Sequence, residues 1–150
     1  MKLAEALQER ADLNRKIQQL EDRLENNVLV QEGETTAEDP AELLAELDEA
    51  VDRLRELMER INCTNCAAAR DGRTITAMIA ERDALHTQLQ VYRNVLSTAS
   101  QTARRATRSE IKILSAVDVR ALQKKADGLA KRLRQTDNHI QELNWSTELQ

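Results

Sequence analysis

Cys63 and Cys66 are the two residues whose types and spacing most directly suggest chemistry. They form a C-x-x-C motif, and two thiolates would supply half of the four ligands of a tetrahedral zinc site. His139 belongs to a helix expected to pass the same end of the fold, so it is the candidate third ligand. A thioredoxin-like redox pair would need a βαβ context, which the sequence lacks. Unligated thiols at a helix end are favoured, while a metal site and a redox pair stay open as alternatives.

Asp83 and His86 lie at positions i and i+3, on one face of an expected helix. Di-iron bundles take a Glu-x-x-His motif from each of two helices, but this chain has a single D-x-x-H. Solvated or hydrogen-bonded imidazoles are therefore favoured at His86 and His139. No nucleophile–histidine pairing follows from the spacing, and three glycines form no phosphate-binding loop. The sequence thus favours neither an enzyme nor a bound cofactor.

The elements that must position these residues are helices. Aromatic residues make up 1% of the chain, charged residues make up 32%, and there is one proline. This composition is typical of long helices rather than of β-sandwiches or barrels. We expect a mainly all-α fold, an antiparallel bundle of about four long helices with a small two-strand β ribbon at one end. At this length the chain should form a single helical domain over residues 1–150.

Capping residues and apolar periodicity set the expected helix boundaries. The first helix should cover about 2–26, and the second should run from Pro40 to near 62–66. The third should follow Thr74 and reach about Gln101, and the fourth should follow Asp118 with an apolar stripe ending at Leu143.

The first and third helices carry apolar residues at heptad positions a and d, which is typical of coiled-coil packing. Arg10 and Arg82 each occupy an a position in these seams. Either arginine could form a buried ion pair that fixes register or partner, or lie with its stem on apolar surface and its head in water. The second helix has a wider stripe, so we expect it to be more deeply buried. That stripe consists of Leu43, Leu44, Leu47, Val51, Leu54, Leu57, Met58 and Ile61.

Two short segments, 28–31 and 110–113, have the pattern of strands and would lie at the same end of an up-down-up-down bundle. The other end collects the loop after Cys66, with its Asp71-Gly72 turn, and the C-terminal tail. Trp145 is the only indole in the chain, and we predict that it docks at that end and buries apolar area.

Charge is unevenly distributed along the chain. Residues 1–60 contain 8 Lys/Arg against 17 Asp/Glu, whereas residues 104–134 contain 10 Lys/Arg against 3 Asp/Glu. A basic stretch of this kind can bind nucleic acid, with Arg104, Arg105 and Arg108 as candidate phosphate contacts. No aromatic residue is interleaved to stack on bases. We therefore favour packing of the acidic half alongside the basic half.

No export signal or membrane-spanning segment is recognisable in the sequence, and two cysteines in such a chain are typical of reduced thiols. We therefore expect a cytoplasmic protein that does not bind membranes.

Several segments, matching in the same order over nearly the whole chain, resemble a family of small uncharacterised bacterial proteins, many of which carry the label septicolysin. The segments are Ile61-Asn62 with Thr64-Asn65, 71–74, 80–85, 108–112, 117–119, and Ile140-Gln141 with 144–149. The resemblance implies a helical, oligomeric protein of unknown function. The label implies a cytolysin, for which the sequence shows neither an export signal nor a membrane-inserting segment. Cys63 and Cys66 are not part of the family pattern.

Long helices with few large side chains leave apolar edges exposed, which favours self-association. We expect a homo-oligomer, a dimer or a higher assembly such as a hexamer. The predicted function is that of a cytoplasmic, self-associating structural or interaction protein. The alternatives are a metal-binding protein that uses Cys63 and Cys66 with a histidine, and a nucleic-acid-binding protein that uses residues 104–134.

Overall fold

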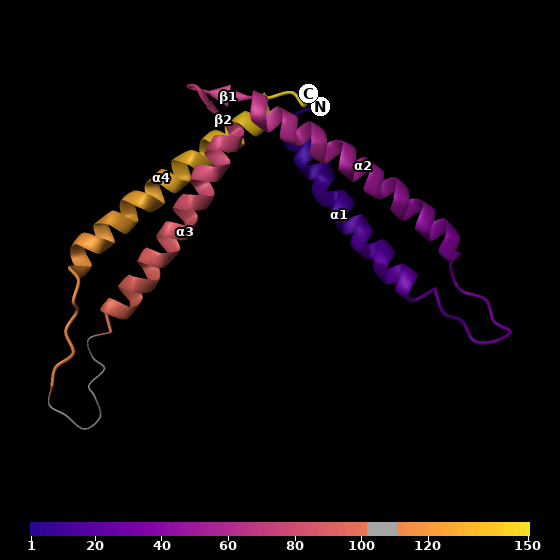
Figure 1. The fold of residues 1–150 in the computed structure, drawn as a ribbon, viewed down its shortest axis with the longest axis horizontal. Coiled ribbons are helices and arrows are strands. Elements are labelled where there is room, and N and C mark those ends of the chain that lie inside the picture. The colour runs from indigo at the N-terminus through magenta and orange to yellow at the C-terminus, as the bar shows by residue number, and fades with distance from the viewer. Residues whose placement is uncertain (102–110) are drawn as a thin grey trace. The chain divides into compact units, whose positions relative to one another are not determined.

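Four long helices and one two-strand ribbon make up the described part of the fold (Figure 1). The computed structural model describes residues 1–101 and 111–150. The helices are α1 (Leu3–Glu25), α2 (Pro40–Ala67), α3 (Ile75–Ala99) and α4 (Val119–Ser146). The strands β1 (Ala69–Arg70) and β2 (Arg73–Thr74) pair between α2 and α3. The predicted mainly helical fold with a small ribbon is confirmed.

Contacts divide the chain into two compact units, which are described separately. The first unit comprises residues 1–70 and 143–150, and the second comprises residues 71–142. The prediction that the whole chain is one domain stays a prediction.

Local capping explains where three of the helices begin. The Asp39 side chain accepts a hydrogen bond from the Ala41 amide at 2.9 Å, and Pro40 occupies the first helical position. Thr74 Oγ1 accepts from the Ala77 amide at 3.2 Å, and Asp118 Oδ1 accepts from the Ala121 amide at 3.0 Å. Each cap satisfies an amide that has no partner within its helix. The predicted starts of these helices are confirmed.

The predicted strands at 28–31 and 110–113 are wrong. Residues 28–31 and 111–113 form no strand, and residue 110 lies outside the described residues. Asn27 instead closes the loop after α1, because its side chain donates to the Arg23 carbonyl at 2.8 Å and accepts from the Glu38 amide at 3.0 Å. The ribbon forms around Asp71 and Gly72, whose φ angles of 52° and 77° suit a tight two-residue hairpin turn.

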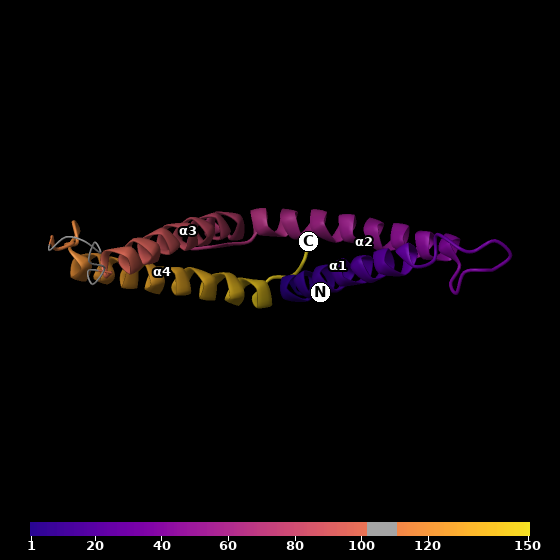
Figure 2. The same ribbon diagram turned by 90° about the horizontal axis from the view of Figure 1, so that it is seen from below.

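In the first unit, α1 and α2 lie side by side as an antiparallel pair (Figures 1 and 2). Leu20, Leu24 and Leu43 form a buried cluster against which Leu47 packs. A polar row runs beside this core at every seventh position of α2. Glu46 pairs with Lys16 at 2.8 Å, Arg53 pairs with Glu9 at 2.7 Å, and the guanidinium of Arg60 donates to the Gln150 carbonyl at 2.7 Å.

In the second unit, α3 packs on α4 through Leu89, Leu96 and Ala126. Glu81 on α3 accepts hydrogen bonds from Arg73 and Arg132, so one carboxylate joins β2 to α4. The seams predicted for the first and third helices are confirmed as packing surfaces within each helix pair. Their buried residues are Leu3, Ala6, Leu20 and Leu24 on α1, and Ile75, Met78, Leu85, Leu89 and Leu96 on α3.

The C-terminal tail closes the first unit by adding a short bridge beside the start of α1. The Leu3 amide donates to the Thr147 carbonyl and the Leu149 amide to the Met1 carbonyl, both at 2.9 Å. Leu149 is only 8% exposed. Thr64, fully buried near the end of α2, accepts from the Gln150 amide at 3.0 Å and donates to the Arg60 carbonyl at 2.8 Å.

The prediction that Trp145 docks is wrong for this chain, because its side chain is 65% exposed. The last helix continues through Ser146, so Trp145 belongs to its final turn, where it lines a hollow together with Ala4 and Gln8 of α1. Backbone hydrogen bonds, the buried side chain of Leu149 and the ion pairs of Glu148 with Lys2 and the N-terminal amine hold the tail instead.

Replacing Thr64 tests this anchor. Thr64→Val keeps the shape but removes the hydroxyl, which leaves the Gln150 amide without its acceptor. We expect the free energy of unfolding to fall by about 1–3 kcal/mol, measured by urea denaturation. Thr64→Ser keeps the hydroxyl and serves as the control. Equal stability of the valine variant and the wild type would contradict a role for this hydrogen bond.

The carboxylate of Glu81 predicts a pH dependence. Hydrogen bonds from Arg73 and Arg132 lower the pKa of Glu81. A carboxyl group with a lowered folded-state pKa stabilises the fold above its unfolded-state pKa, and this stabilisation is lost as the pH falls through the folded-state value. Glu81→Gln should therefore cost up to about 1 kcal/mol at neutral pH and almost nothing in strong acid. Urea unfolding at both pH values measures this. Glu49→Gln, at an exposed site on α2, is the control, and a Glu81→Gln deficit that persists in acid would contradict the assignment.

Candidate functional site

The two cysteines lie within the last turns of α2, since the helix continues to Ala67. Both thiols are exposed. His139 is exposed on α4, and Thr64, between the cysteines, is buried because it anchors the tail. Across residues 1–101 and 111–150, no three His, Cys, Asp or Glu side chains are grouped so that they could hold a metal ion. The metal site at Cys63, Cys66 and His139 stays a prediction without support from the described residues.

Asp83 and His86 line a hollow of about 480 Å³ in the second unit, and the apolar Leu133 is part of the same lining. Arg82 lies beside them and donates to Asp83 Oδ1 at 2.8 Å, so its guanidinium pairs with its own neighbour rather than with the facing helix. Arg134 and Asp137 on α4 complete the polar lining, and sequence reasoning missed both. Their i, i+3 spacing matches that of Asp83 and His86, which was the available signal.

Of the two arginines in the heptad seams, Arg82 is half-buried with its head at the surface, as the snorkelling interpretation expects. Arg10 is also half-buried, on α1.

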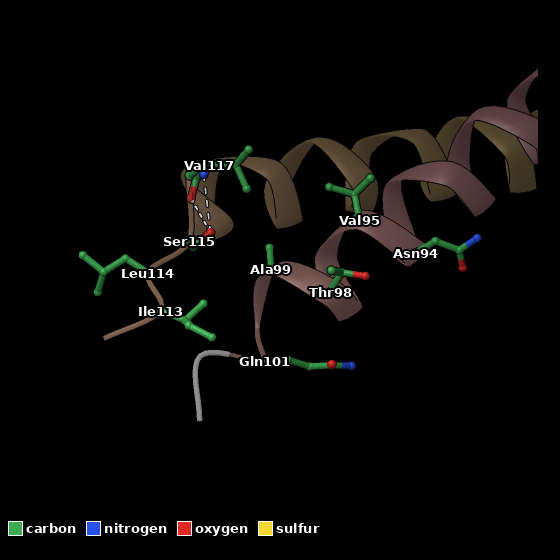
Figure 3. A pocket seen from close by; sticks show the side chains of 10 residues that line it. Asn94, Val95, Thr98, Ala99, Gln101, Ile113, Leu114, Ser115 and Val117 are labelled. Carbon is green, nitrogen blue, oxygen red and sulfur yellow. Dashed lines mark hydrogen bonds between the residues drawn. The ribbon is translucent and has the colours of Figure 1, made fainter. Parts of the chain in front are cut away.

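A second hollow, of about 510 Å³, lies in the second unit between the end of α3 and the segment before α4 (Figure 3). Figure 3 shows Val95 and Ala99 on α3 and Ile113 on the facing segment, and the hydroxyl of Ser115 hydrogen-bonded at Val117. Among the described residues, those that line it carry no ionisable side chain. The described lining offers apolar contact from Val95, Ile113 and Leu114, and hydrogen-bonding groups from Asn94, Thr98 and Gln101.

The basic stretch 104–134 is only partly described. Arg104, Arg105 and Arg108 lie outside the described residues. Of the remaining positive charges, Arg132 pairs with Glu81, and the Lys125 ammonium lies 5.4 Å from the centroid of the Tyr92 ring. These contacts engage two of the cations that a nucleic-acid surface would need.

Outside the core, α2 carries an apolar stripe that no other part of the first unit covers fully. Leu44, Val51 and Met58 follow one another at seven-residue spacing and are 48%, 46% and 45% exposed. The expectation that the wide stripe of this helix is deeply buried is therefore wrong for these three residues. Leu47 and Leu54, between them and the core, are half-buried. We call these five residues the α2 stripe.

The exposed row of the α2 stripe and the buried face of α2 are distinct surfaces, and the half-buried Leu47 and Leu54 lie between them. Four of the five buried positions of α2, Leu43, Ala50, Leu57 and Thr64, also repeat every seven residues, and Ile61 is the fifth. Leu43, Ala50 and Leu57 each precede one member of the exposed row by one residue, which is a rotation of about 100° around a helix. Helices in four-helix bundles contact two neighbours, on faces about a right angle apart. The second face of α2 is therefore shaped for a neighbouring helix, and it is the candidate interaction surface of the first unit.

The exposure of the thiols gives a direct prediction. After gentle reduction, both Cys63 and Cys66 should react with a thiol reagent in the native protein, and the number of modified thiols should equal that of the unfolded protein. The measurement is reagent uptake with and without one equivalent of zinc. Stoichiometric zinc that protects both thiols would instead support the metal interpretation.

None of the helices in the described part of the chain combines the length and apolar character that a membrane span requires.

Comparison with known proteins places the chain among uncharacterised relatives. No curated protein matches it. A solved structure, described as the crystal structure of a functionally unknown conserved protein from Corynebacterium diphtheriae, is 41% identical, with a TM-score of 0.92. The match covers 100% of this chain and 99% of that one. A family model described as a family of unknown function matches residues 10–149. The resemblance to an uncharacterised family is confirmed at that level, and the label septicolysin stays untested. The chain belongs to the family of unknown function DUF6847.

Proposed function

We propose that this protein is a self-associating structural or interaction protein of the cytoplasm, whose chains assemble through the first unit. The observation that supports this proposal is the α2 stripe. Three large apolar side chains at seven-residue spacing, each nearly half exposed, alternate with the half-buried Leu47 and Leu54, so the five form a continuous row rather than scattered surface positions. Continuous rows of this kind mark interaction surfaces, whereas isolated exposed apolar residues are common on any protein.

Energetics favour a partner that covers more than the exposed row. Full burial of a Leu, Val or Met side chain contributes about 1.5–3 kcal/mol, so the remaining half contributes about 1 kcal/mol each. Six such side chains in two chains match only the low end of the association cost, which is about 4–15 kcal/mol. The half-buried Leu47 and Leu54 must therefore be covered as well. A helix laid along α2 would do this, since all five residues lie within roughly 21 Å of its length.

The heptad seams of α1 and α3, which the sequence suggested as surfaces for self-association, are occupied by contacts within the chain. Their a and d residues lie against α2 and α4. The predicted strands at 28–31 and 110–113, which would have offered edges to another subunit, are absent from the described residues. The α2 stripe therefore takes their place as the expected contact between subunits.

Solution mass tests this proposal. Light scattering at micromolar concentration should give at least twice the chain mass of 17.0 kDa. A dimer or an assembly of dimers, such as a hexamer, would agree with this expectation. A concentration series should show the mass fall on dilution, because association depends on protein concentration. A monomeric mass throughout the series would contradict the proposal.

A further inference from the structure

The geometry of the α2 stripe points to one occupant: we propose that it is covered by α2 of a second copy, antiparallel, with the twofold axis at Val51. This inference rests on the proposed self-association and adds the surface, the orientation and the register of the contact. It uses three rows of residues on α2 that share one centre.

The exposed apolar row is the first of these. Leu44, Val51 and Met58 are evenly spaced, so Val51 is the centre of the row. An antiparallel copy places Val51 opposite its own equivalent and Leu44 opposite Met58. Twofold dimers bring the same surface patch together from both chains, and a row with this symmetry is complementary to itself.

The half-buried row has the same centre. Leu47 and Leu54 lie four residues before and three residues after Val51. In the antiparallel register, Leu47 of one copy lies opposite Leu54 of the other, on the side of the stripe that borders the α1–α2 core. The pairing therefore covers the residues that the single chain leaves half-buried, and the two helix pairs together make a four-helix arrangement.

Charge on the outer edge of the stripe selects the orientation. Asp48 and Arg55 lie one row outward, on either side of the same centre, and both are exposed. Arg55 has a side chain that is 69% exposed, and its separations from Asp52 and Glu59 are 3.8 Å and 4.0 Å, at the outer limit for an ion pair. The antiparallel register places Asp48 opposite Arg55 twice. A parallel twofold pairing would instead bring this outer edge beside the Ala50 and Leu57 edge of the other helix, so neither charge would meet an opposite one, which disfavours it.

Asp52 lies one row farther out, and its side chain is 80% exposed. So far from the stripe, the surfaces of the two helices curve away from each other. Both Asp52 carboxylates would therefore remain hydrated, and salt would screen their repulsion. The twofold axis therefore passes through apolar residues, with the charges of Asp52 outside the contact.

Substitution at the centre tests the surface. In Val51→Glu, two carboxylates would meet at the twofold axis without partners, so the dissociation constant should rise by about 100-fold or more. Sedimentation equilibrium of the full chain measures this change. Val91→Glu introduces the same substitution at a valine on α3 that is 55% exposed, and it should leave the dissociation constant unchanged. Circular dichroism should show the same helix content for both variants.

Charge exchange tests the orientation. Asp48→Arg alone and Arg55→Asp alone should each weaken the dimer, because each opposes like charges in the antiparallel register. The double variant with both substitutions restores opposite charges and should recover most of the lost affinity. Recovery identifies the antiparallel pairing, since in a parallel dimer residues 48 and 55 of the two chains would lie on opposite flanks of the contact and could not restore a pair.

The outcomes separate this inference from the proposed function. A wild-type assembly that Val51→Glu leaves intact, or that Val91→Glu dissociates equally, would overturn the α2 contact while self-association stands. Failure of the double variant to recover affinity would overturn the antiparallel register. A wild-type monomer would overturn both proposals. The stripe would then be covered by a different protein or by another part of the same chain.

Discussion

Each helix pair of this protein can bury only the strip of surface along which its two helices meet. This constraint follows from a chain with 1% aromatic residues, because Leu, Ile and Ala reach only a short distance from the helix axis. A pair of helices has no centre comparable with that of a larger bundle. Polar contacts therefore carry much of the specificity, and any apolar row outside the strip stays in contact with water.

The polar contacts of the first unit show how this specificity is arranged. Glu46, Arg53 and Arg60 occupy one row of α2, and each contacts either α1 or the tail. Individual exposed ion pairs contribute little stability, typically below about 1 kcal/mol. Their value here is geometric, because they determine which side of α2 faces α1. In the second unit Glu81 has a similar role between β2 and α4.

Sequence reasoning succeeded where the determinants are local. Asp39, Thr74 and Asp118 each bond an amide within three residues, so the helix starts could be read from residue type and spacing. Sequence reasoning failed where the structure depends on contacts between residues that are far apart in the chain. The Thr64 hydroxyl accepts a hydrogen bond from the Gln150 amide, 86 positions away, and no local sequence pattern predicts that contact. Residues 28–31 have strand-like composition, but a strand needs a partner, and Asn27 closes the loop without one. The sequence itself shows how wide the apolar stripe of α2 is, whereas how deeply the stripe is buried depends on which helices pack against it.

The two seven-residue repeats of α2 also bear on how the first unit avoids misfolding. Leu43, Ala50 and Leu57 face the core, and Leu44, Val51 and Met58 form a second apolar row one residue ahead. Rotation of α2 about its own axis by one residue would exchange the two rows and still present an apolar face to α1. Hydrophobic pattern alone therefore leaves two competing alignments close in energy. In the alternative alignment Arg53 would turn away from Glu9, and Thr64 would turn away from the tail. The contacts of these polar residues therefore make the native alignment of α2 lower in energy than the rotated one.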